Sequence, residues 1–263
     1  MSSFYQNRSY SPYRSFYTLL RKEIRRYLIM APQTLLAPLI TVCLYLLVFG
    51  VSLGRRISLG TEVSYLDFVI PGLILMGAIN NTFANISSSL FLSKYLGNIA
   101  DILVAPISAM QFLMAYTLAA MTRGLLVSAL IYGVSLFFSQ TPWQSPFLGF
   151  FILFLASFIF AQIGVIASLT SASFDTLSMY TNFLLLPLIY LGGLFYPVSN
   201  LPAPWSTLSK FNPLYYLIEG FRSAMLGATE LSIGSAIFGA TIVALILFSI
   251  TYWLIKTGYK LRN

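Results

Sequence analysis

The stretch 187–222 reads PLIYLGGLFYPVSNLPAPWSTLSKFNPLYYLIEGFR and decides how the rest of the chain is interpreted. It begins as an apolar run, breaks at Gly192-Gly193, and continues through prolines that a regular helix cannot accommodate. An apolar run resumes after Asn212-Pro213 but contains Glu219 and Arg222. This run rises only ~20 Å as a helix, too little for a ~30 Å hydrocarbon core. Broken backbone at membrane depth is tolerated only where protein buries it or where it lines a wet cavity, which suggests a gate or pathway entrance.

The composition identifies an integral membrane protein. Of the 263 residues, 58% are hydrophobic and only 8% are charged, whereas a soluble domain carries about a quarter charged residues. The net charge of +8 does not indicate nucleic acid, because the cations flank apolar spans, where cytoplasmic charge is expected. Histidine is absent and Cys43 is the only cysteine. A disulfide within the chain, a cysteine zinc site and a histidine-based enzyme are therefore excluded.

Apolar segments of spanning length predict an all-α integral membrane protein with six transmembrane helices. The predicted spans are residues 32–53, 68–92, 110–138, 146–169, 176–195 and 233–255. Before the last of them, residues 192–228 are predicted to form an extracytoplasmic re-entrant helical hairpin. No repeat and no secretory signal peptide is recognised.

The segment 14–30 has a helical period with cations on one arc and apolar side chains on the other. The cations are Arg14, Arg21, Lys22, Arg25 and Arg26, and the apolar residues are Phe16, Leu20, Ile24 and Tyr27. This pattern predicts an amphipathic helix in the headgroup plane whose cations face anionic membrane lipid. The alternative is a solvated charged helix beside the first span.

Positive charge sets the expected orientation. With six spans, ten Lys and Arg residues lie on the side of the termini, four lie on the other side, and Arg123 lies within a span. Both termini are therefore predicted to be cytoplasmic. The expected domains are a cytoplasmic N-terminus with its interfacial helix (1–31), a transmembrane domain (32–256) and a cytoplasmic tail (257–263).

Polar side chains occur inside two predicted spans. Asn81 and Asn85 are one helical turn apart, and amides are costly against lipid, so they are expected to face protein or a cavity. Hydrogen bonding between helices is one interpretation and a position along a pathway is the other. Arg123 lies ~20 Å along the third span by helical rise. It marks a pathway or a paired site, or it snorkels toward the far interface.

The C-terminal third resembles a known family. The residues that carry the resemblance are Gly192, Gly193, Leu194, Phe195, Tyr196, Pro197, Leu201, Pro202, Asn212, Pro213, Tyr216 and Arg222. In this order and spacing they resemble the C-terminal pattern of ABC-2 type permeases, the membrane subunits of ATP-driven exporters of drugs, lipids and polysaccharides. Without the resemblance, the stretch would be an ordinary extracytoplasmic loop with two turns and a buried helix.

The loop 93–108 is the expected contact with an ATPase. Ile99, Ile102 and Leu103 form a small apolar face at helical spacing, and Pro106 ends the helix. This face is expected to be exposed, as partner sites usually are. The sequence DILVAPIS from Asp101 resembles the family's pattern where a coupling helix sits in a cleft of the ATPase.

The resemblance implies one permease half of an exporter in a bacterial inner membrane. No phosphate-loop motif is present, so ATP and Mg are expected on a separate ABC ATPase subunit. A second permease copy, forming a homodimer, would complete the pathway for a hydrophobic drug, a lipid or a lipid-linked glycan. The chain itself is expected to perform no chemistry and to bind no metal. The alternative is a secondary transporter or channel that is not driven by ATP.

The pathway or gate candidates are Asn81, Asn85, Arg123, Gly192, Gly193, Phe195, Tyr196, Pro197, Asn212, Pro213, Tyr216, Glu219 and Arg222.

Overall fold

The computed structural model describes residues 12–53, 63–227 and 233–261, and these contain helices and turns but no strand. Residues 1–11 of the predicted cytoplasmic N-terminus and residues 262–263 of the predicted tail therefore lie outside the described ranges. Five described helices are long and apolar enough to cross a membrane. They are Pro32–Gly50, Tyr65–Tyr95 (α3), Ala109–Ser135 (α5), Pro146–Thr170 (α6) and Ile233–Thr257 (α11). The predicted all-helical membrane class is confirmed at this level.

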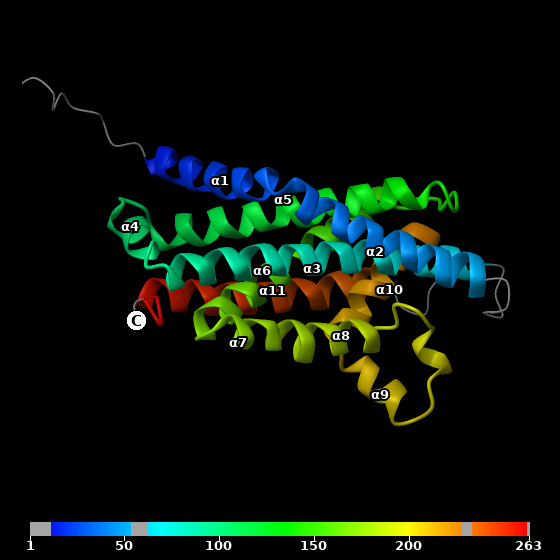
Figure 1. Cartoon of the computed structure of the whole chain (residues 1–263). Helices are drawn as coiled ribbons and strands as arrows, with labels where there is room; N and C mark the ends of the chain where they lie inside the picture. The colour runs from blue at the N-terminus through cyan, green and yellow to red at the C-terminus, as the bar shows by residue number, and fades with distance from the viewer. Residues whose placement is uncertain (1–11, 54–62, 228–232, 262–263) are drawn as a thin grey trace, which may run out of the picture.

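Consecutive long helices run in opposite directions along one bundle (Figure 1). The first of them combines η1 (Pro32–Leu36), α2 (Ala37–Tyr45) and η2 (Leu46–Leu53). The short helix α4 (Ile99–Val104) lies at the same end of the bundle as the C-terminus, here called the α4 end. Helix α9 (Trp205–Lys210), after the turn η4 (Val198–Asn200), lies toward the other end, here called the α9 end, and α10 (Pro213–Leu226) follows it.

The predicted fifth span is helical but is not among the five long apolar helices. Residues 174–191 form α7 (Phe174–Met179), the π-helix η3 (Tyr180–Leu185) and α8 (Leu186–Leu191) in one run. Leu177, Leu185 and Ile189 place this run against the main core. Figure 1 shows it extending along the bundle, and a sixth crossing here remains a prediction.

Helix α3 is the centre of the bundle and packs against α5, α6 and α10. Two glycines allow the close approach. A Cβ atom on Gly124 of α5 would lie 2.0 Å from Thr82 Oγ1, and one on Gly164 of α6 would lie 2.4 Å from Ile86 Cγ2. Small residues at helix contacts are typical of membrane bundles, where close packing replaces the hydrophobic effect between helices.

The segment predicted to be amphipathic is helical, as α1 (Pro12–Ile29), and extends along α5 and leads toward α2 (Figure 1), while its place in the headgroup plane stays a prediction. Leu19, Glu23 and Tyr27 form its buried face. Placing Arg26 on the outward cation face was wrong, because its side chain turns into the bundle and finds acceptors there. Arg26 lies at the edge of the predicted cation arc, where the rotation of the helix decides which way it faces.

Candidate functional site

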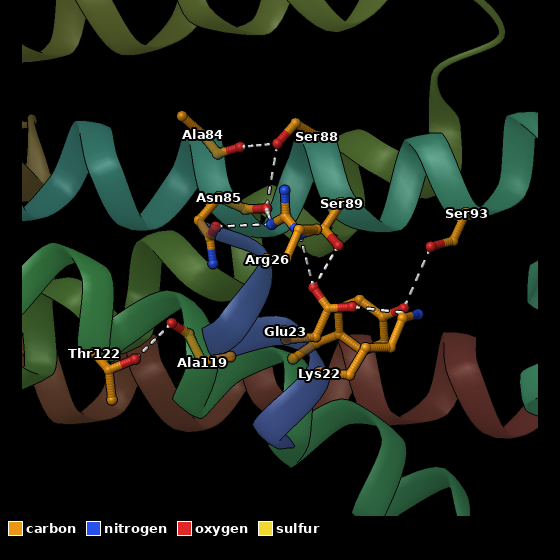
Figure 2. Close-up of polar contacts among 11 residues, drawn as sticks. Lys22, Glu23, Arg26, Ala84, Asn85, Ser88, Ser89, Ser93, Ala119 and Thr122 are labelled. Carbon is orange, nitrogen blue, oxygen red and sulfur yellow. Dashed lines mark hydrogen bonds and ion pairs between the residues drawn. The ribbon is translucent and has the colours of Figure 1, made fainter. Parts of the chain in front are cut away.

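A charged cluster joins α1 to α3 within the bundle. Glu23 is only 1% exposed, and its Oε2 atom accepts a hydrogen bond from Ser89 Oγ at 2.5 Å and lies 3.2 Å from Arg26 Nε. Arg26 Nη2 donates to Asn85 Oδ1 at 2.8 Å and to the Asn85 carbonyl at 3.1 Å. Figure 2 shows Arg26 reaching from α1 to α3, with Glu23 beside Ser89. A cation and a hydroxyl thus satisfy Oε2, which helps this buried carboxylate to be tolerated, whereas Oε1 has no hydrogen-bond partner among the described residues and lies 3.6 Å from Lys22 Nζ.

A second polar pair lies one helical turn away on α3. Arg123 Nη2 of α5 donates to Asn81 Oδ1 at 3.1 Å, and Asn81 Nδ2 donates to the Gly77 carbonyl at 3.0 Å. Arg123 Nε is buried and has no partner among the residues that the structure describes. Helix-to-helix hydrogen bonding, one of the two interpretations of Asn81 and Asn85, is confirmed. The partner that the sequence did not identify for Arg123 is Asn81.

Sequence reasoning missed Glu23, although a signal was available. In a helical projection of α1, Leu19, Glu23 and Tyr27 are four residues apart and lie on one face. An acid in the middle of an apolar face, on a helix with many cations, indicates a buried ion pair rather than a solvated charge. The same contact surface continues through Tyr27 Oη, which lies 3.2 Å from Thr122 Oγ1 of α5.

Two grooves flank this cluster. One has a volume of about 490 Å³ and is lined by Thr18, Arg21, Lys22, Arg25, Arg26 and Ile29 of α1. The other has a volume of about 330 Å³ between α2, α3 and α5. Its polar lining includes Gln33, Thr41, Asn80 and Asn81, and the remainder is mostly apolar. Arg26 thus borders one groove, while Asn81, the partner of Arg123, borders the other.

The remaining candidates lie in the broken region before α11. Arg222 is 2% exposed and donates from Nε to the Phe68 carbonyl at 3.1 Å and from Nη2 to the Gly193 carbonyl at 2.9 Å. Its Nη1 atom pairs with Glu219, and its guanidinium carbon lies 3.7 Å from the centroid of the Phe68 ring. Every nitrogen of this guanidinium has a partner, so the group joins α10, α3 and the Gly192-Gly193 turn.

The motif residues each have a local role in this turn. Gly193 has φ +78, and a Cβ atom there would lie 2.7 Å from Val198 Cγ2. Asn212 Oδ1 caps α10 by accepting from the Leu214 amide at 2.9 Å, while its Nδ2 donates to the Leu188 carbonyl at 2.6 Å. Pro213 follows at the start of α10, where a missing N–H costs nothing.

An aromatic cluster fixes the other side of the turn. The Phe195 ring stacks on Phe49 with a centroid separation of 4.8 Å, and Tyr65 Oη donates to the Phe195 carbonyl at 2.9 Å. Tyr196 Oη donates to the Tyr190 carbonyl at 2.8 Å. The remaining candidates Gly192, Pro197 and Tyr216 are respectively buried, half-buried and half-buried. Among the described contacts, none joins this group to Asn81, Asn85 or Arg123, so the candidates form two separate groups.

The α4 loop differs from its prediction in one respect. The helix and its end before Pro106 are confirmed, since α4 ends at Val104 and Ala105 is extended. The expected exposure is wrong for Ile99, which is 4% exposed and packs with Leu19 of α1 and its neighbours, while Ile102 is half-buried. Ile99 turns inward because α1 and α5 offer apolar partners there. The side chain of Leu103 lies outside the described residues. Asp101 and Val104 are exposed instead, Val104 to 85%.

The architecture defines a polytopic helical membrane protein with charged side chains buried between its spans, as expected of a transport protein. The chain belongs to the ABC-2 type transporter family, which matches residues 14–226. It is 37% identical over 243 residues to the inner membrane transport permease YadH of Escherichia coli K12, covering 92% of this chain and 94% of that protein. It is also 23% identical over 228 residues to nodulation protein J of Rhizobium meliloti, covering 86% and 87% respectively. The chain is therefore a non-catalytic membrane permease subunit, as predicted.

Proposed function

We propose that the chain forms half of the translocation pathway of an ATP-driven exporter in a bacterial inner membrane. A second copy of the chain forms the other half, and two ABC ATPase subunits bind ATP and Mg. The family relationship over residues 14–226 and the similarity to an inner membrane transport permease support this assembly. The observation that carries the pathway is Arg123, a guanidinium placed between apolar spans with one amide partner.

In this proposal the chain crosses the membrane six times, with the run 174–191 as the fifth crossing and both termini in the cytoplasm. The α4 end is then cytoplasmic, and the re-entrant region 192–228 closes the opposite end. The alternation of helix direction in Figure 1 and the cation distribution support this topology. The domains are 1–31, 32–256 and 257–263.

The loop 93–108 would contact the ATPase through Asp101, Leu103 and Pro106, with Ile99 and Ile102 fixing α4 on the bundle. The exposure of Asp101 and Val104 supports this role, because both belong to α4, at the end of the bundle where the ATPase is proposed to dock. A groove of about 410 Å³ is lined by residues of both this loop and α1, and Ile99 packs with Leu19 of α1 beside it. A displacement of α4 by the ATPase would therefore also displace α1.

The decisive experiment is reconstitution of the permease with its ATPase in sealed vesicles. We expect transport of an amphiphile that requires hydrolysable ATP and stops when the ATPase carries a substitution in its phosphate-binding lysine. Transport that persists without ATP, or that follows an ion gradient, would instead identify a secondary transporter or a channel. Failure of the two subunits to co-purify would contradict the proposed assembly.

The topology has its own test. In a Cys43→Ala background, Ser199→Cys should react with a membrane-impermeant thiol reagent from outside the cell, because η4 lies in the region proposed to be extracytoplasmic. Ser3→Cys, outside the described residues, should react only after the membrane is permeabilised. The opposite labelling pattern would reverse the orientation and exclude an ATPase at the α4 end.

A further inference from the structure

The cluster between α1, α3 and α5 contains more positive than negative charge. Arg26 and Arg123 are its interior cations, Lys22 Nζ lies 3.6 Å from Glu23 Oε1 at its exposed edge, and Glu23 is the only carboxylate bonded to it within the described ranges. The other described acids are engaged or placed elsewhere. Asp67 accepts from Ser64 and Ser139, Glu219 pairs with Arg222, and Asp101 and Asp175 are exposed.

The two guanidinium groups also keep unused donors. Arg26 donates from Nε and Nη2, whereas Arg123 donates only from Nη2. Arg123 Nε is buried without a partner, and the described residues supply no acceptor for Nη1 of either arginine. Because an unpaired buried donor costs ~1–3 kcal/mol, and more when it is charged, an acceptor from outside the described chain would stabilise this arrangement.

The asparagines on α3 place these donors close together. Asn81 and Asn85 are one turn apart, about 6 Å along the helix axis, so both arginines reach the same face of α3. Two planar guanidinium forks at such spacing suit the oxygens of a phosphate or carboxylate, which accept bidentate hydrogen bonds.

The grooves on either side indicate what kind of molecule carries the acidic group. The groove beside Arg26 is lined by four cations of α1, and the groove beside Asn81 is lined mainly by apolar side chains such as Leu73, Met76 and Ile131. An ion alone would use only the first of these surfaces. A molecule with an acidic headgroup and an apolar tail would use both.

We propose that Arg26 and Arg123 bind the acidic headgroup of an amphiphile that the transporter carries, with its apolar tail in the groove between α2 and α3. This inference rests on the proposed transport function and specifies its substrate class. The headgroup supplies the negative charge that the cluster lacks and accepts the unused donors of both arginines. Glu23 holds Arg26 in place and offsets part of the positive charge, so that the headgroup can also leave.

Binding of lysophosphatidic acid to the permease–ATPase complex tests the proposal. The complex is placed in nanodiscs of phosphatidylcholine, and lysophosphatidylcholine with the same acyl chain serves as the matched probe. We expect lysophosphatidic acid to bind at least ~10-fold more tightly, the ratio that one charge-assisted hydrogen bond supplies. Inorganic phosphate should compete only weakly, because it lacks the tail. Equal binding of the two amphiphiles would overturn the proposal, and strong competition by phosphate alone would replace the amphiphile with a free anion.

Two substitutions separate binding from folding. Arg123→Ala removes the donors, whereas Asn81→Asp keeps them and gives Arg123 a carboxylate within the chain. Both should lower the affinity for lysophosphatidic acid at least ~10-fold and leave that for lysophosphatidylcholine unchanged. Asn200→Asp makes the same chemical change at an exposed position of η4 and should bind as the wild type does. Wild-type affinity in Asn81→Asp would contradict the site. Acid-selective binding without ATP-dependent transport would support the site and refute the proposed function instead.

Discussion

Two arginines lie inside this membrane bundle, and they are satisfied to different degrees. Arg222 in α10 has a carboxylate, two backbone carbonyls and an aromatic ring as partners. Arg123 in α5 has one asparagine amide and a buried Nε with no partner in the described chain. Both positions are costly for a charge in a membrane. The contacts of Arg222 are explained by the fold, whereas the unpaired donor of Arg123 is the basis of the proposed headgroup site.

The largest expected effect is the loss of Arg222. Arg222→Ala removes the cation that pairs with Glu219 in the protein interior and the donors of two carbonyls. Removing one partner of a buried ion pair typically costs ~3–5 kcal/mol, so we expect little folded permease to be recovered. The midpoint of thermal unfolding of the purified protein measures this loss of stability.

The double variant Glu219→Leu/Arg222→Met is the control for that prediction. It removes both charges, so no unpaired ion remains, and it should be clearly more stable than Arg222→Ala alone. If Arg222→Ala unfolded at the wild-type temperature, Arg222 would not stabilise the fold, and the contrast drawn here with Arg123 would be wrong.

A smaller effect is expected for the ion pair that joins α1 to α3. Glu23→Gln removes the charge that holds Arg26 and weakens the bond from Ser89, which should cost ~1.5–3 kcal/mol. Amide hydrogen exchange should accelerate across α1 while α10 stays protected. Uniform acceleration in both helices would show a general loss of stability instead of release of α1.

The sequence predicts the long helices well but not the pairing of the side chains between them, for physical reasons. Long apolar runs identify the five long helices, because a lipid solvent imposes length and composition on a crossing helix. Asn81 and Arg123 stand out as polar residues in such runs, but their pairing depends on the rotation of α3 and α5, which one sequence does not fix. Glu23 was overlooked because it lies among exposed cations in the sequence. The inward turn of Ile99 depends on apolar surface that α1 and α5 supply.

Arg123→Ala should affect the fold least among the interior substitutions and transport most. It removes one hydrogen bond from a charged donor to an amide, about 1.5–3 kcal/mol, but it also removes the buried unpaired Nε, whose cost offsets this loss. We therefore expect near-normal thermal unfolding and strongly reduced ATP-dependent transport. Arg123→Lys should restore transport only in part, because an ammonium group does not reproduce the guanidinium fork. Normal export by Arg123→Leu would remove Arg123 from the pathway.

The α4 loop extends the comparison to the surface, where no change in the fold is expected. Asp101 and Val104 are exposed, so Asp101→Lys and Val104→Asp break no interior contact. A lysine at position 101 would place a like charge against any cation on the ATPase, and an aspartate at position 104 would introduce an unpaired charge into the interface. Both variants should unfold at the wild-type temperature yet lose co-purification with the ATPase and ATP-dependent transport.

Asp175→Lys is the matched control, because it makes the same exchange at another exposed acid, at the start of α7 near the α4 end. If Asp175→Lys reduced co-purification as much as Asp101→Lys, the effect would be one of net charge, and the α4 loop would lose its special role in coupling.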